Sequence, residues 1–179
     1  MIVHLVRHGQ SEWNESRRVQ GQQDPPLTPL GLTQATAAAD SLRHRPLTAV
    51  WSSDLTRARR TAEPIAAAHG LPVVVDARLR EQCLGVLEGL PQQEALDRSS
   101  GFDWTDVDAA VCGGESLRAV YARLVAVLDP LCRGEAGAEI AVVSHGDAIR
   151  VARCVLAGLP VESVTYDGIP TGTVLTVPI

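Results

Sequence analysis

The sequence predicts an α/β fold, a three-layer sandwich in which a mostly parallel sheet has helices on both faces. Apolar runs rich in β-branched residues, over 2–6 and 139–143, are typical of strands that are buried on both faces. Longer segments with apolar residues at helical spacing lie between these runs, so strands and helices alternate along the chain. Both runs also end close to a histidine followed by glycine, at 8–9 and 145–146. Ligands of open α/β sheets bind at this carboxyl edge of the strands.

The bulk composition describes an ordinary globular protein. With 179 residues, the chain can form one domain with its own core, and we expect a single domain over 1–179. No apolar stretch approaches the roughly 20 residues that cross a bilayer, and the first residues lead into a strand rather than a signal peptide. The formal net charge of -5 disfavours non-specific binding to nucleic acid or anionic lipid. We therefore expect a cytoplasmic protein without nucleic-acid or membrane partners, and the oligomeric state stays open.

Two residue types carry little functional information. Lysine is absent, so all 16 basic residues are arginine and only the position of each one matters. The cysteines are widely spaced and form no Cys-x-x-Cys pair, which disfavours zinc and redox sites. We expect free thiols in a reducing compartment and neither a metal nor a cofactor. The four cysteines are Cys83, Cys112, Cys132 and Cys154.

The first half of the chain supplies a strand, a loop and two helices. The polar segment 15–26 is expected to be a loop that forms one wall of a binding site. Arg17 and Arg18 either line this wall or face water. Thr28 and Pro29 predict the start of a helix that runs to about residue 43. After a strand over 48–52, a second helix is expected with Asp54 as its cap, with Arg57 in its first turn, and with Pro64 kinking or ending it.

The second half continues the alternation. A short strand over 73–76 precedes an irregular segment, 79–89, which carries two carboxylates and two glycines. Residues 90–113 are the least regular part. Apolar periodicity then predicts a helix from about 115 that Pro130 ends, and a second helix over 148–156. A last strand is expected over 173–177.

Five segments follow one another along nearly the whole chain: Arg7-His8-Gly9, Ser52 to Ala62, Leu79 to Gly89, Gly113-Gly114-Glu115-Ser116 and Ser144-His145-Gly146. In this order they resemble the histidine phosphatase superfamily, the phosphoglycerate-mutase-like group. The one mild departure is Gln10, at a place where relatives vary.

The resemblance implies phosphoryl transfer through a phosphohistidine. A catalyst of this reaction must hold the phosphoryl oxygens with cations, present an in-line nucleophile and protonate the leaving oxygen. His8 is then the nucleophile, and its other ring nitrogen should donate to a backbone carbonyl. Arg7 and Arg57 bind phosphoryl oxygens through their planar guanidinium groups, each of which can donate two parallel hydrogen bonds. His145, protonated beside the dianion, stabilises the transition state.

The same resemblance assigns the proton-transfer group and the pocket. Glu81 is the expected general acid, and later the base that activates water. Burial would have to offset the arginines, which favour its ionised form. Glu88 is the second choice and is otherwise structural or substrate-facing. The resemblance also places Asn14, Gln20, Gly21 and Gly146 along the phosphate or substrate pocket.

Several functions remain open at this point. The first is a metal-independent phosphatase that converts a small-molecule phosphate monoester into alcohol and inorganic phosphate. The second is a phosphoglycerate-type mutase, which needs a closing lid. Only a modest loop separates Gly89 from Gly114, and this favours the phosphatase. A non-catalytic phosphate-binding module and a histidine-carboxylate metal site are the remaining alternatives.

Residues 90–113 are expected to overhang the pocket and to set specificity. If the five acids of this segment face the mouth, they should repel substrates with several charges. Phe102, Trp104 or Trp13 either stack on a substrate ring or belong to the core.

Overall fold

The structure is a computed structural model that describes residues 1–133 and 137–179. Within this part of the chain, five strands form one sheet in the order β3-β2-β4-β1-β5. The strands are β1 (Ile2–Arg7), β2 (Leu47–Ser52), β3 (Val73–Val75), β4 (Glu139–Ser144) and β5 (Val174–Pro178). All neighbours are parallel except β5, which runs antiparallel to β1 along the edge. The predicted α/β class with a mostly parallel sheet is confirmed.

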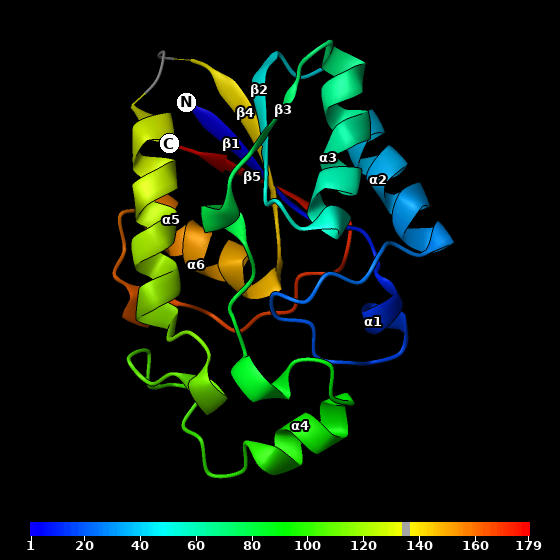
Figure 1. Cartoon of the computed structure of the whole chain (residues 1–179). Helices are drawn as coiled ribbons and strands as arrows, with labels where there is room; N and C mark the ends of the chain where they lie inside the picture. Colours follow the sequence, from blue (N-terminus) through cyan, green and yellow to red (C-terminus); the bar gives the residue numbers. More distant parts are fainter. Residues whose placement is uncertain (134–136) are drawn as a thin grey trace.

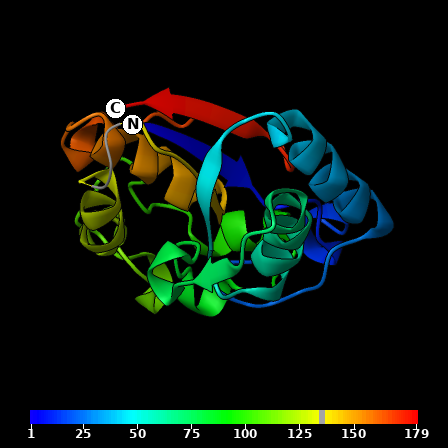
Figure 2. The ribbon, with the colours of Figure 1, turned by 90° about the horizontal axis from the view of Figure 1, so that it is seen from above.

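Helices cover both faces of the sheet, as expected for three layers (Figures 1 and 2). α2 (Pro29–Leu42) and α3 (Thr56–His69) pack on one face, and α5 (Leu117–Cys132) and α6 (Gly146–Leu156) pack on the other. Each face therefore has its own apolar core. Leu42, Val50 and Ile65 belong to the first core, and Leu5, Leu124 and Ile149 belong to the second.

Two short helices, which the sequence did not predict, lie beyond the carboxyl ends of the parallel strands (Figure 1). α1 (Glu12–Glu15) follows β1 directly, and α4 (Gln92–Arg98) forms part of the segment that we expected to overhang the pocket. Single turns of 3-10 helix occupy Ala77–Leu79, Gly85–Leu87, Val111–Gly113 and Val161–Ser163. No helix in the described part of the chain has the length and apolar character needed to span a bilayer.

Helix boundaries agree with the sequence in one case and differ in two. Thr28 caps α2 by accepting from the Gly31 amide at 3.1 Å, as predicted. Asp54 does not cap α3, because Leu55 is the cap residue and the Asp54 carboxylate pairs with Arg80 instead. Pro130 lies inside α5 and does not end it, and Pro64 lies inside α3, where the kink that was the other expectation stays a prediction. In both helices apolar residues beyond the proline pack into a core, and this packing outweighs the lost backbone hydrogen bond.

The exit from β1 requires a close approach of two backbones. A Cβ atom on Gly9 would lie only 2.3 Å from the carbonyl oxygen of Gly31, at the start of α2. A side chain at either glycine would push the two segments apart. The contact between Gly9 and Gly31 therefore fixes the position of the backbone next to His8.

Candidate active site

His8 and His145 face each other at the carboxyl edge of the two central strands. β1 and β4 are parallel neighbours in which Arg7 lies opposite Ser144, so both strands deliver their next residue to the same place. The two ring centroids are 5.1 Å apart, and the rings are tilted by 58°. Both side chains are buried. The two histidines therefore lie side by side at this edge of the sheet.

Two hydrogen bonds define the tautomer of His8. Its Nδ1 lies 2.7 Å from the carbonyl oxygen of Gly9, which can only accept, so Nδ1 carries the proton as predicted. Its Nε2 accepts from Nε of Arg57 at 3.3 Å and therefore carries the lone pair. Burial, followed by the charges of Arg57 and Arg7, holds the pKa of His8 well below its ordinary value. His8 is thus a neutral imidazole at neutral pH, with the lone pair that a nucleophile requires.

Arg57 and Arg7 bring two positive charges to this pair. Arg57 lies in the first turn of α3, is fully buried, and donates to the carbonyl oxygens of Gly21, at 2.8 Å, and Gln23. Burial lowers the pKa of Arg57 to about 10, so the side chain stays protonated at neutral pH. Arg7 donates to the carbonyl oxygen of Ile169, and desolvation lowers its pKa as well. Within the described residues, its Nε atom is buried without a hydrogen-bond partner.

Burial also governs the charge of His145. Burial is the main cause that lowers the pKa of His145 well below its ordinary value, and Arg57 and His8 act in the same direction. Both of its ring nitrogens are buried and have no partner in the part of the chain that the structure describes. His145 is therefore neutral in the protein alone, and its expected protonated state beside a phosphate dianion stays a prediction. Protonation of His145 would need the negative charge of a phosphate dianion beside it.

Glu81 lies against the amino-terminal end of α6. Its carboxylate accepts from the backbone amides of Ala148 at 3.0 Å, Asp147 at 3.3 Å and Gln82 at 3.0 Å. Burial is the largest cause that raises the pKa of Glu81, and the charge of Asp147 adds to it. The amides and Arg7 oppose this shift without reversing it. Burial thus prevails over the arginines, as proton donation by Glu81 requires.

Gly146 and Gly21 both lie against charged side chains. A Cβ atom on Gly146 would lie 3.5 Å from Cζ of Arg7 and 3.6 Å from Oε2 of Glu81, so this glycine sits between the two side chains. Gly21 has a φ of +49°, and a Cβ atom there would collide with the carboxylate of Glu88. Glu88 accepts from the backbone amides of Gln22 and Leu84. It therefore stabilises the loop around Gly21, whose carbonyl oxygens Arg57 also binds. Of the roles considered for Glu88 in the sequence, these hydrogen bonds favour the structural one.

Asn14 and Gln20 are organised by Ser11, which the sequence analysis missed. The buried hydroxyl of Ser11 lies 2.7 Å from Oε1 of Gln20 and 3.1 Å from Oδ1 of Asn14. Ser11 and Asn14 also form the capping box of α1. A serine followed three residues later by a polar side chain is the available sequence signal for such a box. Arg17 and Arg18 in the same loop are both exposed.

Arg123 and Glu115 hold the backbone that carries Glu81, and sequence reasoning gave neither residue a role. The Arg123 guanidinium donates to the carbonyl oxygens of Arg78, Arg80 and Glu81. It also binds the Glu115 carboxylate at 3.0 Å, and that carboxylate accepts from the Cys83 amide at 2.9 Å. Glu115 stands in one of the five resembling segments, whereas nothing in the sequence marks Arg123.

The segment 90–113 lies beyond the strand ends, as expected, but it does not present five acids to the site. In the described part of the chain, Asp106 is the one acid of this segment that lines a hollow beside Glu81. The others are bound by neighbours: Glu94 by Arg98, Asp97 by Gln93, Asp103 by Thr105 and Asp108 by Arg118. The structure therefore does not support the expected repulsion by all five acids.

Among the described residues, no group of three or more His, Cys, Asp or Glu side chains is arranged to hold a metal ion.

Comparisons with known proteins agree with this geometry. A model of the histidine phosphatase superfamily (branch 1) matches residues 3–178. The probable phosphoglycerate mutase GpmB of Yersinia pestis is 41% identical over 166 residues, which are 90% of this chain and 77% of the relative. A mycobacterial glucosyl-3-phosphoglycerate phosphatase, solved with VO3, has a TM-score of 0.89 and 35% identity over 98% of this chain and 90% of its own.

A putative alpha-ribazole-5'-P phosphatase from Escherichia coli is a further structural neighbour. Its TM-score is 0.85 at 26% identity, over 100% of this chain and 91% of the neighbour. The family match covers nearly the whole chain, and structures of phosphatases superpose on its sheet and helices. The chain is therefore an enzyme of the histidine phosphatase superfamily, branch 1.

Proposed function

We propose that the protein is a metal-independent phosphatase that hydrolyses a small-molecule phosphate monoester through a phosphohistidine on His8. The observation that carries this proposal is the hydrogen-bonded state of His8. Its Nδ1 proton is bound to the Gly9 carbonyl oxygen, and its Nε2 lone pair lies among Arg7, Arg57 and His145.

The first half of the reaction forms the phosphoenzyme. The lone pair on Nε2 of His8 attacks phosphorus, and the bond from phosphorus to the ester oxygen breaks. Glu81 gives its proton to that oxygen, so that the neutral alcohol leaves. Arg7 and Arg57 bind the other phosphoryl oxygens. His145 stabilises the charge of the transition state, and the dianion itself favours protonation of this ring.

The second half releases phosphate. Ionised Glu81 takes a proton from water, the water oxygen attacks phosphorus, and the bond from phosphorus to His8 breaks. Inorganic phosphate leaves, and both His8 and Glu81 return to their starting states. Two structural neighbours carry phosphatase names, and one of these was also solved with inorganic phosphate, in support of this product.

A phosphoglycerate-type mutase is the second candidate, and the name of the GpmB relative favours it. The same residues would act, but the phosphoryl group would return to a reoriented substrate instead of passing to water. The segment 90–113, which lies beyond the strand ends, consists of α4 and connecting turns. It contains no larger insertion that would shelter the phosphoenzyme from water. This supports the phosphatase as first choice.

The proposal extends to the setting of the enzyme. We propose that residues 1–179 act as one domain in the cytoplasm, on a small phosphate ester and without nucleic-acid or membrane partners. The four cysteines, all of which lie in the described residues, are free thiols. This supports a reducing compartment.

The test is release of inorganic phosphate from a panel of monoesters, with a chelator present throughout. We expect turnover by the wild type, loss of turnover in His8→Ala, and full turnover in His44→Ala, which removes an exposed histidine. Activity that depends on an added metal would contradict the metal-independent mechanism. Isomerisation of 3-phosphoglycerate that is faster than phosphate release would make the mutase the better description.

A further inference from the structure

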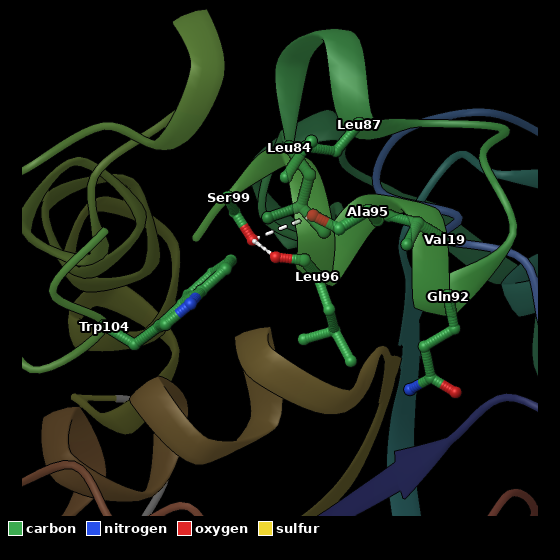
Figure 3. Close-up of a pocket in the computed structure, with 8 residues that line it drawn as sticks. All are labelled: Val19, Leu84, Leu87, Gln92, Ala95, Leu96, Ser99 and Trp104. Atoms are coloured by element: carbon green, nitrogen blue, oxygen red, sulfur yellow. Dashed lines mark hydrogen bonds between the residues drawn. The ribbon is translucent and has the colours of Figure 1, made fainter. Parts of the chain in front are cut away.

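Two hollows are lined in part by the same residue, Trp104, which belongs to the segment 90–113. Figure 3 shows the first, where the ring of Trp104 lies beside Leu96 and below Leu84 and Leu87. Its volume is about 130 Å³, and no charged side chain lines it. Such a hollow offers nothing that would bind a phosphate ester, and we assign it no ligand.

The second hollow adjoins the group proposed to protonate the leaving oxygen. It has a volume of about 200 Å³, and both Gln82 and Asp147 line it. Gln82 follows Glu81 in the chain, and the backbone amide of Asp147 donates to Oε2 of Glu81. The ester oxygen must reach Glu81 to receive its proton. Glu81 itself does not line the hollow, but the part of the substrate attached to that oxygen would extend past Glu81 toward Gln82 and Asp147, which do.

Aromatic side chains form one wall of the second hollow. Phe102 and Trp104 pack edge to face with centroids 5.0 Å apart, and the Tyr166 hydroxyl donates to the Trp104 carbonyl oxygen at 2.7 Å. The Trp104 and Tyr166 side chains are 41% and 51% exposed. Their rings are thus held in place yet remain available to a ligand. A fixed aromatic face suits a flat or ring-shaped group better than a flexible chain.

The charges of the hollow disfavour an acidic ligand. Asp106 and Asp147 bring two carboxylates, and Arg150 brings one positive charge. Arg150 is already bound to the Asp147 carboxylate and to the Asp167 carbonyl oxygen. Carboxylate oxygens accept hydrogen bonds from hydroxyl groups but repel another carboxylate. The volume is below the roughly 300–1,000 Å³ of sites for drug-sized ligands, which suits a single ring.

We propose that this hollow is the leaving-group subsite and that it takes an uncharged ring bearing hydroxyl groups, as in a sugar monophosphate. The inference rests on the proposed phosphatase function and names its substrate class. The ring would lie against Trp104 and donate hydroxyl hydrogen bonds to Asp106 and Asp147. A glycerate carboxylate, by contrast, would meet those two acids.

Three esters separate the effects of ring and charge. The experiment measures kcat/KM for methyl riboside 5-phosphate, glycerol 3-phosphate and 3-phosphoglycerate. The last two differ in having a hydroxymethyl group or a carboxylate at one end. We expect the riboside to be the best substrate and 3-phosphoglycerate to be the worst. If 3-phosphoglycerate equals or exceeds the other two, the subsite is wrong while the phosphatase function stands.

Variants of the hollow localise the preference. Trp104→Ala should lower the ratio of kcat/KM for riboside over glycerol ester by on the order of tenfold, because the stacking face is lost. Asp106→Asn should raise the ratio for 3-phosphoglycerate over glycerol 3-phosphate. Leu159→Ala removes an apolar side chain of similar exposure, 47%, that does not line the hollow, and it is expected to change neither ratio. Unchanged ratios in the first two variants would overturn the proposal.

A binding measurement tests the subsite apart from turnover. Calorimetry with His8→Ala compares methyl riboside 5-phosphate with inorganic phosphate. We expect the riboside ester to bind more tightly, and this advantage to shrink when Trp104→Ala is added. If the riboside ester binds no better than phosphate, the subsite is refuted even if the wild type hydrolyses other esters. Absence of turnover on every ester would instead refute the proposed function.

Discussion

Nε of Arg57 donates to Nε2 of His8 at 3.3 Å, so the proposed nucleophilic atom is held by the side chain proposed to bind the phosphoryl group. If Nε2 of His8 carried a proton, two N–H donors would face each other, and the positive charge of Arg57 would repel the protonated ring. The lone pair is therefore protected by the same charge that attracts the substrate. Catalysis requires the phosphoryl group to take the place of this hydrogen bond.

Burial of two neutral histidines makes the stability of the protein depend on pH. The pKa values of His8 and His145 are lowered in the folded protein, so the unfolded chain binds their protons first as the pH falls below about 6.5. The free energy of unfolding should then decrease by about 1 kcal/mol for each histidine between pH 6.5 and 5.5. Urea unfolding at several pH values measures this decrease.

The comparison of variants isolates the contribution of the histidines. Glu81 acts in the opposite sense, because its raised pKa favours the folded state as the pH falls. We expect a weaker pH dependence in His145→Gln and an unchanged one in His44→Gln, which alters an exposed residue. Equal slopes in His145→Gln and the wild type would contradict the prediction.

Replacing Glu81 should slow turnover in a way that depends on the leaving group. Glu81→Gln keeps the size of the side chain but removes the proton, and for an alkyl ester we expect kcat to fall by roughly 10²–10⁴-fold. An aryl phosphate needs less help from an acid, so it should still form the phosphoenzyme. Rapid mixing would then show a burst of one aryl alcohol per protein, followed by slow turnover. A similar loss on both esters without a burst would argue against Glu81 as the acid.

Asp147 should set the alkaline limit of activity. Its negative charge helps burial to raise the pKa of Glu81, so Asp147→Asn should lower that pKa and ionise Glu81 at a lower pH. The alkaline limb of the kcat/KM profile should move to lower pH in this variant. Asp167→Asn, which alters an exposed partner of Arg153, serves as the control and should leave the limb in place. An unmoved limb in Asp147→Asn would show that another group limits activity at high pH.

Arg123 and Glu115 should behave as one coupled pair. Arg123→Met removes the donor to the carbonyl oxygen of Arg80 and one of the two donors to that of Glu81, and Glu115→Gln weakens the same network. Each change should lower the free energy of unfolding by roughly 1–3 kcal/mol, and each should lower kcat because Glu81 loses its position.

A double-mutant cycle measures this coupling. The double variant should lose less stability than the two single losses combined, because the residues share one network. Arg60→Met, which removes an arginine from a surface ion pair, should change stability little. Full additivity of Arg123→Met and Glu115→Gln would disprove the coupling.

Much of the fold could be predicted from the sequence because local and global signals agree there. The apolar runs before His8 and His145 are buried on both faces, so their strand character and their central position share one cause. Once both strands are parallel neighbours, the two histidines have to meet. Thr28 likewise satisfies a local rule that no tertiary contact overrides.

The remaining features depend on contacts between distant segments. Asp54 had the right chemistry for a helix cap, but Arg80, from another segment, binds its carboxylate. Arg123 looks like a surface residue of an amphipathic helix until the 78–83 backbone lies against it. The charge of His145 depends on how completely water is excluded, and a sequence pattern does not reveal this.

The position of β1 has a consequence for synthesis of the chain. β1 is made first, yet both strands that flank it, β4 and β5, are made last. During translation its backbone N–H and C=O groups and its apolar side chains lack their partners until the far end of the chain is made, and such long-range pairing is slow to form. A nascent chain that has not reached Ser144 carries His8 without His145 and exposes strand edges that invite aggregation. From this order of the strands we expect folding to depend on chaperones and to be sensitive to early termination.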